Sequence, residues 1–214
     1  MHILSHPQLF LQHIPLTQVL NNPGPSEFPR SPHPGYGVQD FTWEMDTTPG
    51  GPTVLLNGTV QEIYAELLKI NPSYDGDFAE TLAAAQAAAE TETQTETEAS
   101  TGAASLHKRL PVTCNNYDQA ITRRIREGIT YLRGVSGRPT HGPGPGNCGR
   151  VSCSYNSATW WCNENTSPNT LPGFNNIADG AQVVLNHSAP TDIYISGEED
   201  HADKWRAVVR RSPC

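Results

Sequence analysis

Apolar side chains recur at helical spacing in three segments of the chain, which predicts helices over residues 60–70, 116–133 and 172–187. Within each segment the apolar residues are three or four positions apart, so they fall on one face of a helix. The three faces comprise Val60, Ile63, Tyr64, Leu67 and Leu68 in the first helix, Tyr117, Ile121, Ile125, Ile129 and Leu132 in the second, and Phe174, Ile177, Ala181, Val184 and Leu185 in the third.

Start and stop residues support the first two helices. Thr59 and Glu62 have the spacing of a capping box at the start of the first helix. Asn115 or Asn116 can cap the second helix, and Gly134 is suited to end it. These signals agree with the apolar periodicity on the start of the first helix and on both ends of the second.

Segments with strand character lie between and around these helices. The stretch "GRVSCSYNSATWWCNEN", residues 149–165, predicts a hairpin with its turn at Asn156-Ser157. The other strand-like segments are "FTWEMD" at 41–46, "TVLLN" at 53–57, "RLPVTC" at 109–114, "DIYISG" at 192–197 and "KWRAVVRR" at 204–211.

After Arg109 the predicted order is strand, helix, hairpin, helix, and then a final strand or hairpin. A small antiparallel sheet with both helices on one face accommodates this order without crossing connections. The predicted fold class is therefore α+β, of the split βαβ type, preceded by a largely disordered leader.

Composition divides the 214-residue chain near Lys108-Arg109. Residues 1–109 hold four basic and thirteen acidic residues, a net charge of −9, whereas residues 110–214 hold ten and nine, a net charge of +1. We predict a poorly ordered N-terminal segment (1–52), a pro-region hairpin and helix (53–75), an acidic low-complexity linker ending in the dibasic site (76–109) and a mature domain (110–214).

All five cysteines, Cys114, Cys148, Cys153, Cys162 and Cys214, follow this boundary. Their density is typical of small exported domains, and their spacing does not suit a zinc site. We expect two disulfides and one remaining thiol, which leaves a monomer or a dimer through the unpaired cysteine. The spacing leaves the pairing open, although Cys153 and Cys162 would face the same side of the hairpin near the distance limit for a bridge.

The dibasic pair Lys108-Arg109 lies where an acidic leader meets the cysteine-containing part. A kexin-type protease reads such a pair, because an acidic cleft selects two cationic side chains. We therefore predict cleavage after Arg109 in an exported precursor. Residues 1–20 nevertheless lack a convincing signal peptide, since they have no basic start and prolines interrupt their apolar run.

Residues 110–214 resemble fungal secreted cysteine-rich proteins of the kind grouped with killer toxins and plant-pathogen effectors. The resemblance rests on "ITYLRGVSGRPTHGPGPGNCGRVSCSYNSATWWCNEN", "FNNIADGAQVVLNH" and "DKWRAVVRRSPC". It implies a killer-toxin-like α/β sandwich and an extracellular location. Such proteins usually have an even number of cysteines, with one near the end of the second helix, where this chain has His187-Ser188.

Several residues are candidates for surface contact or modification. Trp160 and Trp161 point to opposite faces of one strand, so one is expected in the core and the other partly exposed. Arg123, Arg124 and Arg126 lie off the apolar stripe of the second helix and could face an anionic surface. Asn57, Asn165 and Asn186 each begin an Asn-x-Ser/Thr triplet and are candidate glycosylation sites.

The chain carries no convergent set of catalytic residues. His141, His187 and His201 could join Asp192, Asp200 or Asp203 in a site, but the simpler interpretation is exposed loop residues. Gly144, Gly146 and Gly149 spell a nucleotide-binding pattern without the strand–turn–helix unit it needs, and "GPGPG" is better interpreted as a rigid turn that delivers Cys148 to the sheet. We expect no cofactor and no metal ion.

These patterns favour a secreted effector or toxin-like binding protein that acts outside the cell without catalysis after release by cleavage. Its expected partners are a kexin-type protease and an extracellular host protein, glycan or membrane surface, with no role for nucleic acid. The alternative is a secreted hydrolase that acts on a cell-wall polymer, with a site among Asp192, His201 and their neighbours.

Overall fold

A computed structural model describes residues 31–80, 83–84, 109–188 and 193–214, with only the backbone described for residues 109–111. Its main feature is a six-stranded sheet in the order β1-β8-β9-β13-β12-β4. The neighbours are antiparallel except for β1 and β8, which run parallel. The strands span Gly37–Val38 (β1), Asn147–Ser154 (β8), Ser157–Asn163 (β9), Trp205–Arg211 (β13), Gly197–His201 (β12) and Arg109–Cys114 (β4).

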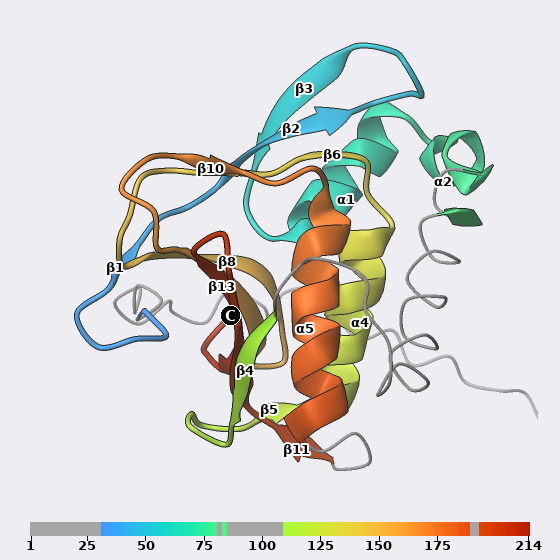
Figure 1. The fold of residues 1–214 in the computed structure, drawn as a ribbon. Helices are drawn as coiled ribbons and strands as arrows, with labels where there is room; N and C mark the ends of the chain where they lie inside the picture. Colours follow the sequence, from blue (N-terminus) through green and yellow to red (C-terminus); the bar gives the residue numbers. More distant parts are fainter. Residues whose placement is uncertain (1–30, 81–82, 85–108, 189–192) are drawn as a thin grey trace, which may run out of the picture.

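Two helices, α4 (Thr122–Arg133) and α5 (Phe174–Ser188), lie side by side against one face of this sheet (Figure 1). Helix α4 buries Ile125, Ile129 and Leu132, as its apolar stripe predicts. The observed order of strand, helix, hairpin, helix and strand pair is the predicted one, and the mixed α+β class is confirmed.

Helix α4 begins six residues later than the sequence predicts, so the expected start at residue 116 is wrong. Residues Ala120–Ile121 instead form strand β5, which pairs with β11 (Tyr194–Ile195). The amide of Ile121 donates to Ser157 Oγ and the amide of Thr122 to the Ile193 carbonyl, at 3.0 and 2.9 Å. These tertiary partners satisfy backbone groups that a longer helix would have used.

The hairpin of β8 and β9 turns at Tyr155 and Asn156, which have φ of 49° and 56°, one residue earlier than predicted. The register also shifts at Val151, where β8 carries an extra residue opposite β9. Because of this bulge, Cys148 lies directly opposite Cys162.

Two disulfides stabilise the sheet, as predicted, and the pairing is Cys148–Cys162 and Cys153–Cys214. The first joins the two strands of the hairpin, and the second ties β8 to the C-terminal residue, with Cα atoms 5.6 Å apart. Cys114, at the end of the edge strand β4, is the free thiol.

Residues 31–80, which precede the boundary, form an ordered layer, called the first layer, that packs on the second layer formed by the described residues of 109–214. The predicted strands at 41–46 and 53–57 appear as β2 (Thr42–Asp46) and β3 (Thr53–Asn57), which form a small sheet with β6 (Gly137–Arg138) in the order β3-β2-β6. Two helices follow, α1 (Val60–Ile70) and α2 (Tyr74–Asp77), and α1 has the predicted capping box. A further pair, β7 (Thr140–His141) with β10 (Asn169–Thr170), completes the fold.

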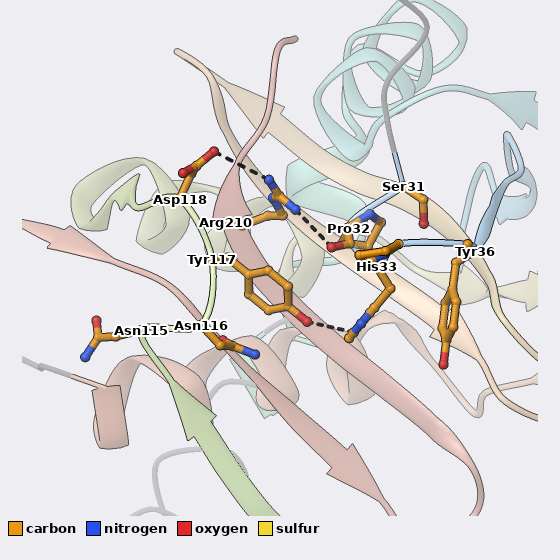
Figure 2. Close-up of a pocket in the computed structure, with 11 residues that line it drawn as sticks. Ser31, Pro32, His33, Tyr36, Asn115, Asn116, Tyr117, Asp118 and Arg210 are labelled. Atoms are coloured by element: carbon orange, nitrogen blue, oxygen red, sulfur yellow. Dashed lines mark hydrogen bonds and ion pairs between the residues drawn. The ribbon is translucent and has the colours of Figure 1, made fainter.

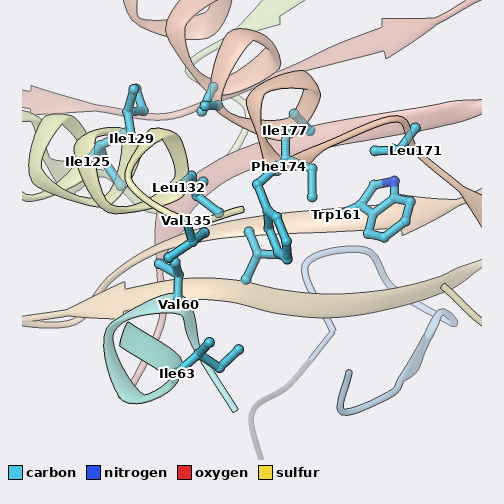
Figure 3. Close-up of a cluster of buried hydrophobic side chains, with 14 of the residues drawn as sticks. Val60, Ile63, Ile125, Ile129, Leu132, Val135, Trp161, Leu171, Phe174 and Ile177 are labelled. Carbon is cyan, nitrogen blue, oxygen red and sulfur yellow. The ribbon is translucent and has the colours of Figure 1, made fainter. Parts of the chain in front are cut away.

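One hydrophobic cluster joins the two layers (Figure 3). From the first layer it contains Phe41, Trp43, Met45, Val60, Ile63, Leu67, Tyr74 and Phe78, and from the second Ile125, Ile129, Leu132, Trp161, Phe174 and Ile177 among others. The poorly ordered segment predicted for 1–52 and the separate pro-region predicted for 53–75 therefore do not describe residues 31–78, because the largest apolar side chains of these residues are buried against residues 120–209. The predictions for residues 1–30 and 85–108 fall outside the described residues.

Candidate functional site

The face of the sheet opposite the helices carries a network of charged side chains. Strands β12 and β13 alternate, so Glu198 and Asp200 share this outer face with Arg206 and Arg210, whereas Glu199 and His201 face α5. Arg206 is the centre of the network. Its guanidinium lies 2.9 Å from Asp200 Oδ1, 3.3 Å from Glu164 Oε1 and 3.4 Å from Glu198 Oε2.

Burial and ion pairing act in opposite directions on these groups. Burial by itself lowers the pKa of Arg206, but Asp200, Glu164 and Glu198 together raise it above its ordinary value. Burial by itself raises the pKa of Glu198, but hydrogen bonds from His33 and Tyr117 hold it below the ordinary value. Arg206 and Glu198 therefore both stay charged at neutral pH.

The N-terminal segment contributes His33 to this network. His33 Nε2 lies 2.8 Å from Glu198 Oε2 and 2.7 Å from the Tyr117 hydroxyl, which itself donates to Glu198 at 2.6 Å. Burial and the hydrogen bond to Glu198 raise the pKa of Tyr117, so the phenol stays protonated. Tyr36 from the same segment donates to Glu164 Oε2 at 3.1 Å.

Between this segment and the turn after β4 lies a solvent-open cavity of about 790 Å³ (Figure 2). Asn115, with φ of 59°, turns the chain at the end of β4, a conformation that Asn tolerates better than most residues. Arg210 forms part of the cavity wall, and it donates to the Pro32 carbonyl at 2.9 Å and lies 3.7 Å from Asp118 Oδ2. The cavity is lined by Ser31, Pro32, His33, Pro34, Gly35 and Tyr36 on one side and by Asn115, Asn116, Tyr117, Asp118 and Arg210 on the other.

This lining combines two phenol rings with amide, carboxylate, imidazole and guanidinium groups. Aromatic faces pack against apolar parts of a ligand, while the amides and charged groups donate and accept hydrogen bonds. Such a set is suited to a ligand that is rich in hydroxyl groups. Residues His33 and Tyr36 were not identified from the sequence, since their partners lie more than 80 positions away.

The two predicted contact tryptophans lie elsewhere, and the expectation that one is exposed is wrong. Trp160 and Trp161 are both fully buried. Trp161 belongs to the main cluster, and Trp160 packs on the outer side with the Cys148–Cys162 disulfide and Val208. Both faces of the sheet are covered at this point, because Tyr36 and Tyr117 pack against this cluster on the side that the helices leave open.

The predicted arginines occupy one end and the outer side of α4, away from the cavity. Arg123 and Arg124 both pair with Glu127, at 3.1 and 2.8 Å, which reduces the positive charge of this face. Arg124 also lies over the ring of Tyr155, 3.8 Å from its centroid. Arg126 is exposed.

The three Asn-x-Ser/Thr triplets differ in accessibility. Asn57 and Asn186 are exposed, and each has an ordered polar neighbour, Thr42 and Gln182 respectively. Asn165 is half-buried and donates to the carbonyl groups of residues 203 and 204.

The predicted histidines do not come together. His141 is fully buried between Phe41 and Trp161, so the expectation of an exposed loop residue is wrong for it. His201 stacks on Trp205 and contacts Glu199, on the face of the sheet opposite Asp200. His187 is exposed on α5, Asp203 is exposed, and Asp192 lies outside the described residues. Among the described residues, no three His, Cys, Asp or Glu side chains are placed to hold a metal ion.

The predicted processing site lies at the edge of the sheet. Lys108 is outside the described residues, and Arg109 is the first residue of β4, opposite His201 at the end of the strand. Strand β4 is an edge strand, so its other side is not occupied by a neighbouring strand of this sheet.

Comparisons with protein families, with curated proteins and with solved structures found no match to this chain. In the described part of the chain, no helix combines the length and apolar character that a membrane crossing needs.

Proposed function

We propose that this protein is an extracellular effector or toxin-like binding protein without catalytic activity, and that the cavity between residues 31–36 and 115–118 is its binding site. The observation that carries the proposal is the lining of that cavity, where Tyr36, Tyr117 and Arg210 converge from three distant segments. The target class that this lining fits best is a glycan.

Two further features support the proposal. Two disulfides in a small sheet suit an oxidising compartment outside the cytosol. The packing of α4 and α5 on one face of an antiparallel sheet is compatible with the killer-toxin-like sandwich that the resemblance implies.

The alternative is a secreted hydrolase acting on a cell-wall polymer. Its strongest candidate carboxylates are now Glu198, Asp200 and Glu164, which converge on Arg206. Glu198 has a lowered pKa and accepts hydrogen bonds at both oxygens, from Asn116 at one and from Tyr117 at the other. An ionised, fully bonded carboxylate is a poor proton donor, so Glu198 is not suited to be the acid of a hydrolase. Burial raises the pKa of Asp200, which leaves that carboxyl as the candidate acid of the alternative.

Binding is tested with the full chain on an array of fungal and plant cell-wall glycans, followed by calorimetry with the best ligand. Replacing cavity residues one at a time, Asn115→Ala and Tyr36→Phe, should weaken binding at least about tenfold, because each removes a polar contact in the cavity. Arg123→Ala, on the exposed side of α4, is the matched control and should bind as the parent does. Release of reducing ends from any of the polymers would instead support the hydrolase.

We further propose that a kexin-type protease cuts after Arg109 during export. The support is the coincidence of Lys108-Arg109 with the charge and cysteine boundary, and the position of Arg109 at the free end of an edge strand. Expression behind a functional signal sequence in a fungal host, followed by N-terminal sequencing, should give Leu110. A product that is intact through residues 105–112 would contradict this step.

A further inference from the structure

We propose that residues 31–78 stay bound to residues 109–214 after the chain is cut between them, so that the processed protein is a non-covalent two-chain protein. The inference rests on the proposed cleavage, and it replaces release of the C-terminal part by retention of both parts. Residues 31–78 of the same chain thus cover the surface of residues 109–214 that release would leave exposed.

Aromatic contacts across the boundary carry the first part of the argument. Phe41 stacks on Trp161 with ring centroids 5.5 Å apart, and Trp43 packs on Phe174 at 5.0 Å. Phe41 lies so close to Gly149 on β8 that a Cβ atom there would collide with its ring. Both Phe41 and Trp43 are buried, so removal of the first layer would open the centre of the cluster to water.

Helix α1 supplies a second contact. Its buried side chains Val60, Ile63 and Leu67 pack into the cluster that contains Ile125 and Ile129 of α4. An amphipathic helix of this length is not stable alone in water, so its apolar face needs this partner.

Hydrogen bonds set the position of the first layer on the second. Strand β1 extends the main sheet beside β8, and the Gln39 amide donates to the Cys148 carbonyl at 2.8 Å. From α1, Gln61 Nε2 donates to Ser152 Oγ at 2.7 Å. Ser136 Oγ donates to Asp46 at 2.6 Å beside the pairing of β2 with β6.

The contact between the parts involves backbone pairing, side-chain hydrogen bonds and a shared core, which are the features of a single folded unit. A soluble monomer rarely exposes an apolar patch larger than about 300–600 Å². The C-terminal part without the first layer would expose the surfaces that now contact eight large apolar side chains of residues 41–78.

No disulfide can join the two parts, because all five cysteines follow Arg109. The two chains would therefore separate in denaturant without any reductant. The cavity has the same composite origin, since His33 and Tyr36 come from one part and Tyr117 and Arg210 from the other. Retention of residues 31–78 thus preserves both walls of the proposed binding site.

The test uses the full chain with a site-specific protease sequence in place of residues 91–98 in the acidic linker. After purification and cutting, both fragments should elute together in size exclusion at the position of the uncut protein. The same sample should give two bands on a denaturing gel without reductant. Elution of a folded C-terminal fragment by itself would overturn the inference.

Variants locate the contact. Gly149→Ala should increase dissociation of the cut protein about tenfold or more, because the added methyl group displaces Phe41. Gly173→Ala, where a Cβ atom meets nothing within 4 Å, is the control and should leave the complex intact. If Gly149→Ala fails to fold, Gln61→Ala removes two hydrogen bonds across the contact, one to Ser152 and one from the Cys153 amide, and should raise dissociation measurably. An unchanged complex in both Gly149→Ala and Gln61→Ala would contradict the assigned surface.

This experiment separates the two proposals. Co-elution of the fragments without glycan binding would leave the two-chain assembly standing and contradict the proposed function. Separate elution, together with glycan binding by the uncut chain, would contradict the assembly and leave the binding site standing.

Discussion

His141 is a buried imidazole at the junction of the two layers. Its ring lies edge-on to Phe41 at 4.7 Å and to Trp161 at 5.2 Å between centroids. Burial lowers the pKa of His141 to about 4, and its hydrogen bonds with backbone groups only partly oppose this effect. The side chain is therefore neutral in the folded protein at neutral pH.

The pH dependence of stability should report this burial. The unfolded chain binds the proton of His141 near its ordinary pKa of 6.5, so between pH 6.5 and about pH 4 the unfolded state holds more protons. The contribution of neutral His141 to the free energy of unfolding should be fully present above pH 6.5 and should fall by about 3 kcal/mol as the pH drops to about 4. Urea unfolding at a series of pH values measures this slope.

His141→Leu should remove most of that slope, whereas His187→Leu, which removes an exposed imidazole on α5, should retain it. Loss of the charge on Glu198, whose pKa is lowered, begins only below its ordinary pKa of 4.5, so the slope due to His141 is measured between pH 6.5 and 4.5. An unchanged slope in His141→Leu would contradict the assignment.

Cys114 and Ser188 form the second feature at the residue scale. Ser188, buried at the end of α5, donates a hydrogen bond to the Cys114 sulfur of β4. The resemblance places a cysteine near the end of this helix, and the structure brings that position next to the free thiol.

Ser188→Cys should therefore form a third disulfide with Cys114. Closing a loop across 74 positions should raise the free energy of unfolding by about 2–4 kcal/mol. Intact mass would show the loss of two further hydrogens, and calorimetry the higher Tm. Asn186→Cys, exposed on the same helix, should leave two reactive thiols, and the same outcome in Ser188→Cys would contradict the contact.

At the scale of elements, the buried apolar face of α1 should contribute more to the free energy of unfolding than exposed apolar residues on the adjacent strand. Val60, Ile63 and Leu67 are buried, whereas Leu55 on the adjacent strand β3 is 71% exposed. Similar aliphatic residues therefore differ in what their truncation costs.

Leu67→Ala should lower the free energy of unfolding by about 2–5 kcal/mol, because it removes buried methyl groups and leaves a cavity. Leu55→Ala should change it by less than about 0.5 kcal/mol. Denaturant unfolding of the full chain measures both. Equal effects would show that α1 does not contribute to the common core.

For the molecule as a whole, charge and cysteine content change at Arg109 while the hydrophobic core extends across it. Both disulfides lie within residues 148–214, so oxidation stabilises the second layer directly and the first layer only through packing. The boundary in composition is thus not a boundary in the fold.

Thiol labelling of the purified protein checks this arrangement. In denaturant without reductant one cysteine, Cys114, should be labelled, and after reduction all five should be. Five labelled cysteines before reduction would contradict the disulfides and the extracellular assignment that depends on them.

The sequence by itself determined three of the described helices, apart from the start of α4, the longer strands β2, β3, β8, β9 and β13, and the number of disulfides. Apolar periodicity, caps and turn residues are local signals, and they were sufficient for α1, α5, the end of α4, the strands β2 and β3 and the hairpin β8–β9. The boundary at Lys108-Arg109 was also a local signal, but composition does not report which segments share a core.

Tertiary structure alone decided the disulfide pairing, the burial of Trp160 and the cavity. The bulge at Val151 changes which residues of the hairpin face each other, and no pattern in β8 marks it. His33 and Glu198 are 165 positions apart, and their contact exists because β1 joins the sheet beside β8. Local patterns fix how each segment folds, whereas packing between distant segments fixes which side chains meet, because that depends on the fit of all the faces at once.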